Sequence, residues 1–391
     1  EGWVETSAGP RRVYRGNVDV DRTDPHAAAI AGGDFMLRQV ETDGRFRYRY
    51  HPYEDSGFGD PGEYSLARHA GAAYSFAQLY SVTSDARFAE GAQHALAWLN
   101  QQVAVPCGPA KPDGACLQEG GRVAFGPSAL AAIAMFEYQR RTKDARYQET
   151  AAALVTFLAS LQRPDGSFEH GYDFHQGRVI LSPPRMFASE QAALALVLAD
   201  RAVGGGRWAP AAARALDHLT LKKYDFFLGR FIYGADHWTC IAAEEAWPTL
   251  KSRHFWEFCR GYAAFMRRLQ YAPDPHSSPR DFAGHFGFGY QLVPQAPATA
   301  GFTEALLSTL ALARHHGAEE DARWLAADAR AALGALLREQ LSSDNTYLVQ
   351  TPARAAGGFR RSTVEPEIRI DFVQHATSAL ARARGLGISS L

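Results

Sequence analysis

The sequence has almost no net charge and no long apolar run, and each absence excludes a class of protein. Its 391 residues include 41 Lys and Arg and 42 Asp and Glu, so the formal net charge is −1. A charge this small excludes a strong overall attraction to nucleic acid or to anionic lipid. No apolar stretch approaches the roughly 20 residues that a membrane-spanning helix needs. The sequence therefore predicts neither a nucleic-acid partner nor a membrane span.

Motifs for common metal, nucleophile and phosphate chemistry are also missing. The chain has no C-x-x-C or H-E-x-x-H ligand pair, no G-x-S-x-G turn and no G-x-x-x-x-G-K loop. The segment "DHWTC" (236–240) offers Asp236, His237 and Cys240, and His375 could complete a zinc site. This spacing is not that of a zinc motif. We therefore expect no bound metal and no cofactor, with a zinc site as the alternative.

Cysteine is scarce, with four in the chain. Cys107 and Cys116 flank the loop "CGPAKPDGAC", where a local disulfide and two free thiols are equally compatible with the sequence. Cys240 and Cys259 lie in helix-like segments, and we expect them to be buried thiols. A disulfide would favour a periplasmic or secreted protein over a cytoplasmic one. The first residue is Glu1, which suggests a mature or trimmed chain.

A short tag recurs along the chain, as "TSDARF" (83–88), "TKDARY" (142–147) and "EEDARW" (319–324). Asp85 and Asp144 are 59 residues apart, and Asp144 and Asp321 are 177 apart, three times that period. Internal periods of this kind indicate stacked supersecondary units. Because Asp commonly caps a helix amino terminus, the tag predicts the start of one helix in each unit.

Two kinds of helix alternate along the sequence. Amphipathic helices, with one apolar stripe, are predicted at 86–102, 145–162, 206–220, 252–269 and 322–341, and an opening helix at 25–40. Helices that are apolar or small on nearly every face are predicted at 65–80, 128–138, 189–199, 237–247, 303–313 and 375–383. A helix that is apolar all round is enclosed by other helices.

Twelve helices in six such pairs predict an all-α fold, an (α/α)6 toroid with an inner and an outer ring. We expect one domain over residues 1–391, in which 1–23 form an amino-terminal arm. Strand patterns are scarce, and "RFRYRY" (45–50) predicts a short β-hairpin arm at 43–52 that covers one mouth of the toroid.

The amino-terminal ends of the inner helices are the predicted site. Free N–H groups and helix dipoles gather there, and so do the long loops 41–62, 103–125, 163–186, 221–236, 271–300 and 342–369. An aromatic residue occurs at every entry: Tyr64, Phe125, Phe187, Trp238, Phe302 and Phe372. Arginines that suit carboxylates or sulfates occur at four entries: Arg68, Arg122, Arg185 and Arg369.

Acids and histidines at the same ends are the candidate catalytic groups. Glu63 precedes the first inner helix, and His69 lies one turn inside it. Asp371, Gln374 and His375 share one face of the last inner helix, which is costly unless they line a cavity. Asp236, His237 and Glu304 enter two further inner helices and could bind substrate or cap those helices.

A polar loop could cover this mouth. The segment "LQRPDGSFEHGYDFHQGR" (161–178) begins with a tight turn. Beyond the turn come Glu169, His170, Tyr172, Asp173 and His175, which could form a lid or could simply be solvated.

These features resemble the carbohydrate-active (α/α)6-toroid enzymes: N-acylglucosamine 2-epimerases, uronate C5-epimerases and unsaturated glucuronyl hydrolases. The likeness covers residues 24–385 in length, helix number and the acid-, His- and Arg-lined mouth. It implies an enzyme that acts on an acidic oligosaccharide or polysaccharide by acid/base chemistry.

A glycoside hydrolase is the activity that we expect first, and other activities are alternatives. For a glycoside hydrolase, Asp371 and Glu63 would be the carboxyl pair, with His69 and His375 orienting groups or relaying protons. For an epimerase or lyase acting on uronates, His375 or Tyr64 would move the proton next to the carboxylate, and arginine would stabilise the enolate. A non-catalytic protein that binds glycan or peptide, and a metal-dependent cyclase or transferase, are the remaining alternatives.

Overall fold

Two concentric rings of helices make up the body of the protein. The computed structural model describes residues 3–7, 9–12, 24–57, 64–109, 113–223, 236–272, 280–287, 293–343, 345–346 and 348–388. The inner helices are α2 (Leu66–Thr83), α4 (Phe125–Thr142), α6 (Ala188–Val203), α8 (His237–Leu250), α10 (Ala296–His315) and α13 (Ile370–Gly385). The outer helices are α1 (Pro25–Gln39), α3 (Ala86–Gln101), α5 (Gln148–Ser160), α7 (Ala209–Asp217), α9 (Arg253–Arg267) and α11 (Glu319–Glu339).

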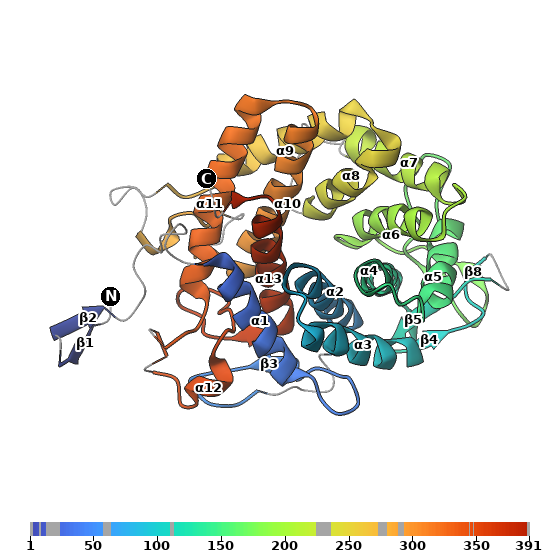
Figure 1. Ribbon diagram of the computed structural model, residues 1–391. Coiled ribbons are helices and arrows are strands. Elements are labelled where there is room, and N and C mark those ends of the chain that lie inside the picture. The colour runs from blue at the N-terminus through green and yellow to red at the C-terminus, as the bar shows by residue number, and fades with distance from the viewer. Residues whose placement is uncertain are drawn as a thin grey trace.

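The inner ring is closed. Going round it, α2 packs on α4, α4 on α6, α6 on α8, α8 on α10, α10 on α13, and α13 again on α2 (Figure 1). Each inner helix also packs on the outer helix that follows it, and α13 packs on α1, so the two ends of the chain complete the sixth pair. The predicted (α/α)6 toroid is therefore confirmed.

The inner helices are buried on nearly all sides, as their composition predicts. In α4 every residue from Ser128 to Tyr138 is buried, whereas α3 buries one stripe that includes Phe88, Ala92 and Leu96. Full burial of one large apolar side chain contributes about 1.5–3 kcal/mol. Small residues such as alanine let six inner helices approach one another in a ring without leaving voids.

The first two copies of the tag build the same turn between an inner and an outer helix. Ser84 ends α2 in the left-handed conformation, with φ 57°, and Asp85 then accepts a hydrogen bond from the Arg87 N–H at 3.0 Å. Lys143 ends α4 with φ 66°, and Asp144 accepts from the Arg146 N–H at 3.0 Å. The two turns share this Asp hydrogen bond, but only Asp85 is the N-cap of its outer helix, because α5 begins at Gln148 with Tyr147 at the N-cap and no side-chain cap.

The third copy has a different structure. Asp321 lies in the first turn of α11 and not before the helix, and its carboxylate accepts hydrogen bonds from Arg260 and from the Trp324 indole. Gly317, with φ 64°, takes the left-handed position after α10. The tag therefore lies at the approach to or the start of an outer helix in all three copies, but its Asp is the N-cap only in the first.

The structure also contains short β-strands. They are β1 (Trp3–Thr6) with β2 (Gly9–Arg12), β3 (Arg49–Tyr50) with β9 (Ile368–Arg369), β4 (Val103–Ala104) with β5 (Cys116–Glu119) and β6 (Arg122–Val123), and β7 (Tyr172–Asp173) with β8 (Arg178–Val179). The predicted strand at 43–52 exists, but its partner is not local. It pairs with β9, more than 300 residues later, because β9 leads into α13 beside α2.

The cysteines differ from the expectation of two buried thiols. Cys107 and Cys116 form a disulfide with an S–S distance of 2.04 Å, and Cys240 and Cys259 form a second one that joins α8 to α9. The prediction of free thiols at Cys240 and Cys259 is therefore wrong. Sequence could not show that their positions face each other across two packed helices, with Cα atoms 5.6 Å apart.

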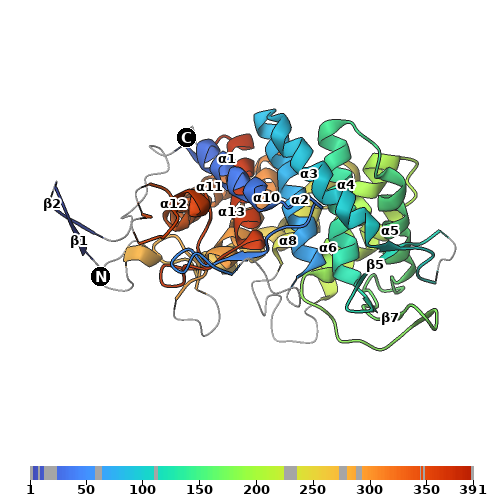
Figure 2. The same cartoon turned by 90° about the horizontal axis from the view of Figure 1, so that it is seen from below.

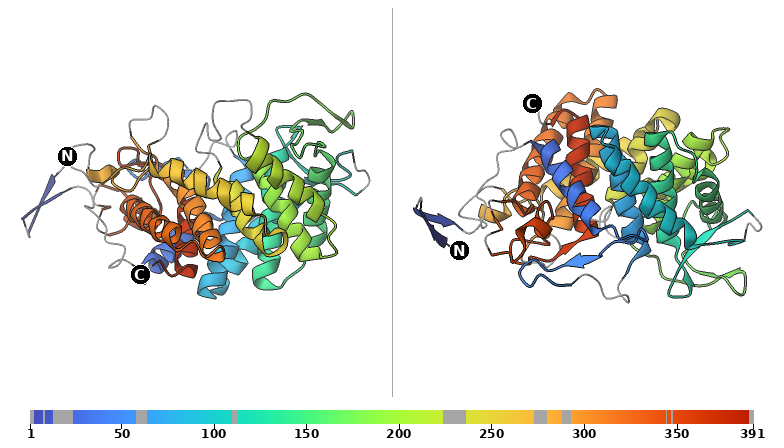
Figure 3. Two further views of the ribbon diagram at one scale, coloured as in Figure 1. Left: turned by 90° about the horizontal axis from the view of Figure 1, so that it is seen from above. Right: turned by 60° about the horizontal axis from the view of Figure 1, so that its bottom comes forward.

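The long connections lie on one side of the helix rings, along the lower edge of Figure 2. They lead into the inner helices, whereas turns as short as residues 84–85 and 251–252 lead into outer ones. The short α12 (Pro352–Ala355) lies in one of the long connections, and the β1–β2 hairpin lies beside the rings (Figure 3).

Among the described helices none is both long and apolar enough to cross a membrane. The division into one domain and an arm stays a prediction.

Candidate active site

Three side chains from three inner helices meet in the ring. His375 of α13 donates a hydrogen bond from Nδ1 to Glu304 Oε2 of α10, at 2.7 Å. The ring of His237, at the start of α8, lies edge-on to His375 with 5.6 Å between the centroids. One potential ligand atom from each of the three residues lies within 4.8 Å of the others. The toroid therefore gathers two imidazoles and a carboxylate that are far apart in the sequence.

The surroundings move the pKa values of the two histidines apart. Burial and the nearby His375 and Lys223 charges hold the pKa of His237 well below its ordinary value. Burial also lowers the pKa of His375, but the Glu304 carboxylate outweighs burial and leaves that pKa above its ordinary value. The surroundings thus favour the neutral form of His237 and, compared with an ordinary histidine, the protonated form of His375.

Two buried polar atoms of this cluster have no hydrogen-bond partner in the part of the chain that the structure describes. They are Nε2 of His237 and Oε1 of Glu304. Buried polar groups are rarely left unpaired, and such atoms commonly serve a ligand. Two histidines and a glutamate could hold a transition metal. The alternative zinc set is not assembled, because Cys240 is in a disulfide and Asp236 bonds to Lys223.

A second group, at the start of α2 and α13, is an ion-paired cluster. Arg369 binds both carboxylate oxygens of Asp371, at 2.6 and 2.9 Å, and Arg68 approaches the same carboxylate at 3.1 Å. Arg68 also lies over the ring of Tyr48 and donates to its hydroxyl, while Arg369 lies over Phe372. The structure thus brings Arg68, Arg369 and Asp371 together, with two positive charges against one negative charge.

Sequence analysis missed an ion cluster at the entry of α8. Lys223 bonds to Asp236 at 2.8 Å and to Glu190 of α6, and both carboxylates are buried. Lys223 follows a π-helical turn, His218–Lys222, that extends α7. The sequence pattern indicates this cluster only weakly, because a lysine that follows a helix is usually solvated. Asp236 therefore pairs with a lysine and does not face the site as a free acid.

His69 lies in the packing between α2 and α3. The Tyr64 hydroxyl donates to His69 Nδ1 at 2.7 Å, and His69 Nε2 donates to the Ala95 carbonyl at 2.9 Å. Burial lowers the pKa of His69 to about 4. Both ring nitrogens of His69 are occupied by these bonds. Neither His69 nor Tyr64 therefore has a role in the proposed reaction.

The remaining predicted site residues lie beside His375, at the surface or outside the described residues. Gln374 and Trp238 are buried beside His375, with Gln374 Nε2 3.5 Å from His375 Nδ1 and the Trp238 ring centroid 6.2 Å from that of His375. Arg122 and Arg185 are exposed. Glu63 lies outside the described residues, so its pairing with Asp371 stays a prediction. Of the six entry aromatics, Phe125, Trp238, Phe302 and Phe372 are buried and pack in the ring.

The polar loop 161–178 is fixed by one of its own histidines. His170 stacks on Phe125 with 4.9 Å between ring centroids. Its Nδ1 accepts a hydrogen bond from the Arg185 N–H at 2.7 Å, and its Nε2 bonds to Ser189 Oγ at 2.9 Å. Burial lowers the pKa of His170, which favours the neutral ring that can accept this bond. A lid function for the loop stays a prediction.

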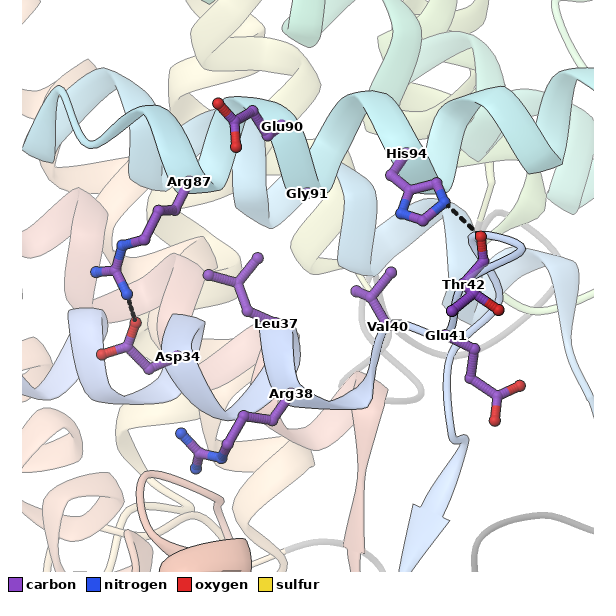
Figure 4. A pocket seen from close by; sticks show the side chains of 10 residues that line it. All are labelled: Asp34, Leu37, Arg38, Val40, Glu41, Thr42, Arg87, Glu90, Gly91 and His94. Carbon is purple, nitrogen blue, oxygen red and sulfur yellow. Dashed lines mark hydrogen bonds and ion pairs between the residues drawn. The ribbon is translucent and has the colours of Figure 1, made fainter.

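A surface groove of about 760 Å³ lies elsewhere, between the outer helices α1 and α3 (Figure 4). Leu37 and Val40 line it beside several charged residues. Its charges are partly paired, as Arg87 bonds to Asp34 at 3.0 Å, and His94 donates to the Thr42 carbonyl at 3.1 Å. The groove belongs to the outer ring and does not include the histidine cluster.

Comparison with known proteins shows the fold. No family profile and no curated protein sequence matches the chain. Solved structures do match, among them a D-mannose isomerase with 12% identity and a TM-score of 0.70, over 93% of this chain and 98% of that one. A cellobiose 2-epimerase from Spirochaeta thermophila DSM 6192 has 15% identity and a TM-score of 0.65, over 92% and 96%.

An unsaturated glucuronyl hydrolase specific for heparin has 14% identity and a TM-score of 0.64, over 93% of this chain and 97% of its own. Sequence identities this low show that the fold is shared and show nothing about activity. The resemblance predicted from sequence is confirmed at that level: the chain has the fold of these (α/α)6-toroid carbohydrate-active enzymes.

Proposed function

We propose that the protein is a sugar epimerase or isomerase that moves a proton at the carbon next to the sugar carbonyl. The observation that carries the proposal is the pair of opposed imidazoles, His237 and His375, whose pKa values are pushed in opposite directions. Two titratable groups with separated pKa values are the usual mark of an acid and a base.

The chemistry follows from these protonation states. Neutral His237 removes the proton from carbon 2 of an open-chain aldose, and the electrons move to the carbonyl oxygen to give an enediolate. Protonated His375 then returns a proton to carbon 2 from the other face for epimerisation. For isomerisation it returns the proton to carbon 1, and the hydroxyl proton on carbon 2 passes to the carbon-1 oxygen. Glu304 holds the Nδ1 proton of His375, so its Nε2 proton is the one that is transferred. Exchange with solvent restores the starting states.

Hydrolysis has less support among the described residues. A glycosidase needs one protonated carboxylic acid and one free carboxylate. Both carboxyl groups already have partners: Asp371 is ion-paired with two arginines, and Glu304 is bonded to His375. The remaining candidate acid, Glu63, lies outside the described residues. The matched structures include a D-mannose isomerase and a cellobiose 2-epimerase as well as an unsaturated glucuronyl hydrolase, so the likeness is compatible with both reactions.

The substrate class is proposed to be a sugar with an anionic group. Arg68 and Arg369 outnumber Asp371 at the start of α2 and α13, so this cluster keeps one positive charge. A carboxylate or sulfate on the sugar could share these guanidinium groups.

Deuterium incorporation tests the reaction type. The protein is incubated in D2O with neutral aldoses, uronates and disaccharides, and the signal of the hydrogen on carbon 2 is followed by NMR. We expect loss of that signal, a fall of at least about a hundredfold in His237→Asn and His375→Asn, and little change in His94→Asn on the outer surface. Turnover without deuterium at carbon 2 of an epimer or at carbon 1 of a ketose, or full activity in both histidine variants, would show that the proposal is wrong.

A further inference from the structure

Phe187 has a backbone conformation that is unusual for its residue type. It precedes α6 with φ 68° and ψ −19°, in the left-handed region. The other described non-glycine residues with positive φ are polar or charged: Ser84, Lys143 and Lys251 end inner helices, and Asp55 lies in a turn. A bulky residue there is strained and persists only where its surroundings enforce it.

His170 supplies that enforcement. It accepts a hydrogen bond from the N–H of Arg185, two residues before Phe187, and bonds to the hydroxyl of Ser189, two residues after it. Its ring is in turn fixed against Phe125. The segment on both sides of Phe187 is therefore held by one buried imidazole that comes from the polar loop.

The half-buried Phe187 ring contacts the proposed site. It lies edge-on to His237, with 5.1 Å between the centroids. Apart from the ring of the adjacent Trp238, with 5.4 Å between the centroids, the other groups around His237 are polar. His375 of α13 and Glu304 of α10 lie across the ring, and Lys223 with Asp236 and Glu190 lies at the start of α8. Phe187 thus provides an apolar wall on one side of a buried imidazole among charged neighbours.

We propose that Phe187 is a positioning residue for His237: its ring fixes the orientation of that imidazole and shields it from solvent, and His170 holds the strained backbone that places the ring. The proposal rests on the proposed function only in treating His237 as a proton-transfer group. Orientation matters because a small displacement of a catalytic group can cost a large factor in rate. Shielding matters because burial is what keeps His237 neutral.

The test uses Phe187→Ala and Phe187→Gly, with Phe174→Ala as the matched control. Phe174 lies in the same loop and contacts His175. The imidazole signals of His237 are assigned from their absence in His237→Asn and recorded by NMR without substrate. We expect them to shift in both Phe187 variants, because the edge-on ring that orients the imidazole is removed, and to be unchanged in the control.

Kinetics and unfolding complete the test. In both Phe187 variants we expect kcat to fall about tenfold with KM changed less than about threefold. Because glycine accepts a positive φ and alanine does not, Phe187→Gly should be at least as stable as Phe187→Ala. Unchanged His237 signals, or a glycine variant that is less stable than the alanine variant, would contradict the proposal. Shifted His237 signals in a protein without proton-transfer activity would refute the proposed function and leave the positioning role intact.

Discussion

Glu304 decides which histidine carries the proton. Its carboxylate raises the pKa of His375 against the opposing effect of burial. Glu304→Gln keeps the shape of the side chain and removes the charge, so the pKa of His375 falls. Because the proposed reaction needs protonated His375, the high-pH limb of the kcat profile should move down by about one unit or more. Exposed Glu90 on α3 provides the control, as Glu90→Gln should leave the profile unchanged.

The same substitution has a sign-specific effect on stability. A histidine whose folded pKa is raised stabilises the protein fully below its unfolded pKa, and this contribution is lost as the pH rises through the folded value. The difference in Tm between the wild type and Glu304→Gln should therefore be larger at about pH 6 than at about pH 9. A difference that grows toward high pH would contradict the assignment of the proton to His375.

The turn between inner and outer helices gives a prediction for the recurrent tag. Asp85 caps α3, whereas Asp321 lies inside α11. Loss of a capping side chain costs about 1 kcal/mol, and loss of a first-turn acid costs about 0.3–1 kcal/mol. Urea unfolding should therefore show a larger loss of stability for Asp85→Ala than for Asp321→Ala, with Glu90→Ala nearly neutral. The reverse order would mean that the tag is not a cap in its first copy.

At the opposite ends of the inner helices, ion pairs between partly buried side chains connect the helices of the inner ring. Glu245 of α8 binds Arg140 of α4 and Arg201 of α6, and Arg382 of α13 binds Glu244 of α8. A cavity of about 280 Å³ lies among them. These bonds join helices that are not consecutive in sequence, so we expect them to act on the stability of the whole ring.

Glu245→Gln tests this expectation. Burial raises the pKa of Glu245, but the two arginines outweigh burial and lower it to about 2. A lowered carboxyl pKa stabilises the protein above the unfolded value, about 4.5, and this contribution is lost as the pH falls toward 2. Near pH 7 we expect a loss of about 3 kcal/mol, which shrinks in acid. Exposed Glu320 gives the control variant Glu320→Gln, and equal losses in both variants would contradict the prediction.

The architecture could be predicted because it depends on local patterns. Helices that are apolar all round alternate with amphipathic ones, and this alternation alone specifies two rings. The roles within the site could not be predicted in the same way. Sequence analysis selected His375, His237 and Glu304, but it placed Asp371 in the catalytic carboxyl pair with Glu63. Arg68, which joins the neighbouring Arg369 against Asp371, comes from a distant segment, so this ion pairing could not be predicted.

Two further features depend on contacts across the fold. The Cys240–Cys259 disulfide requires that α8 and α9 present these residues to each other, and the Lys223 cluster requires a lysine to turn back toward two inner helices. Neither the disulfide nor the lysine cluster corresponds to a local pattern in the sequence. Tertiary packing, which decides which polar groups share a buried space, is what the sequence alone does not reveal.

The most direct test is a crystal structure with an open-chain sugar alcohol, which has no carbonyl and cannot react. We predict that its carbon 2 lies between the imidazoles of His237 and His375, with ring nitrogens of both residues in contact with the ligand. A ligand bound in the groove between α1 and α3, or at the mouth without contact to either histidine, would contradict the proposed reaction.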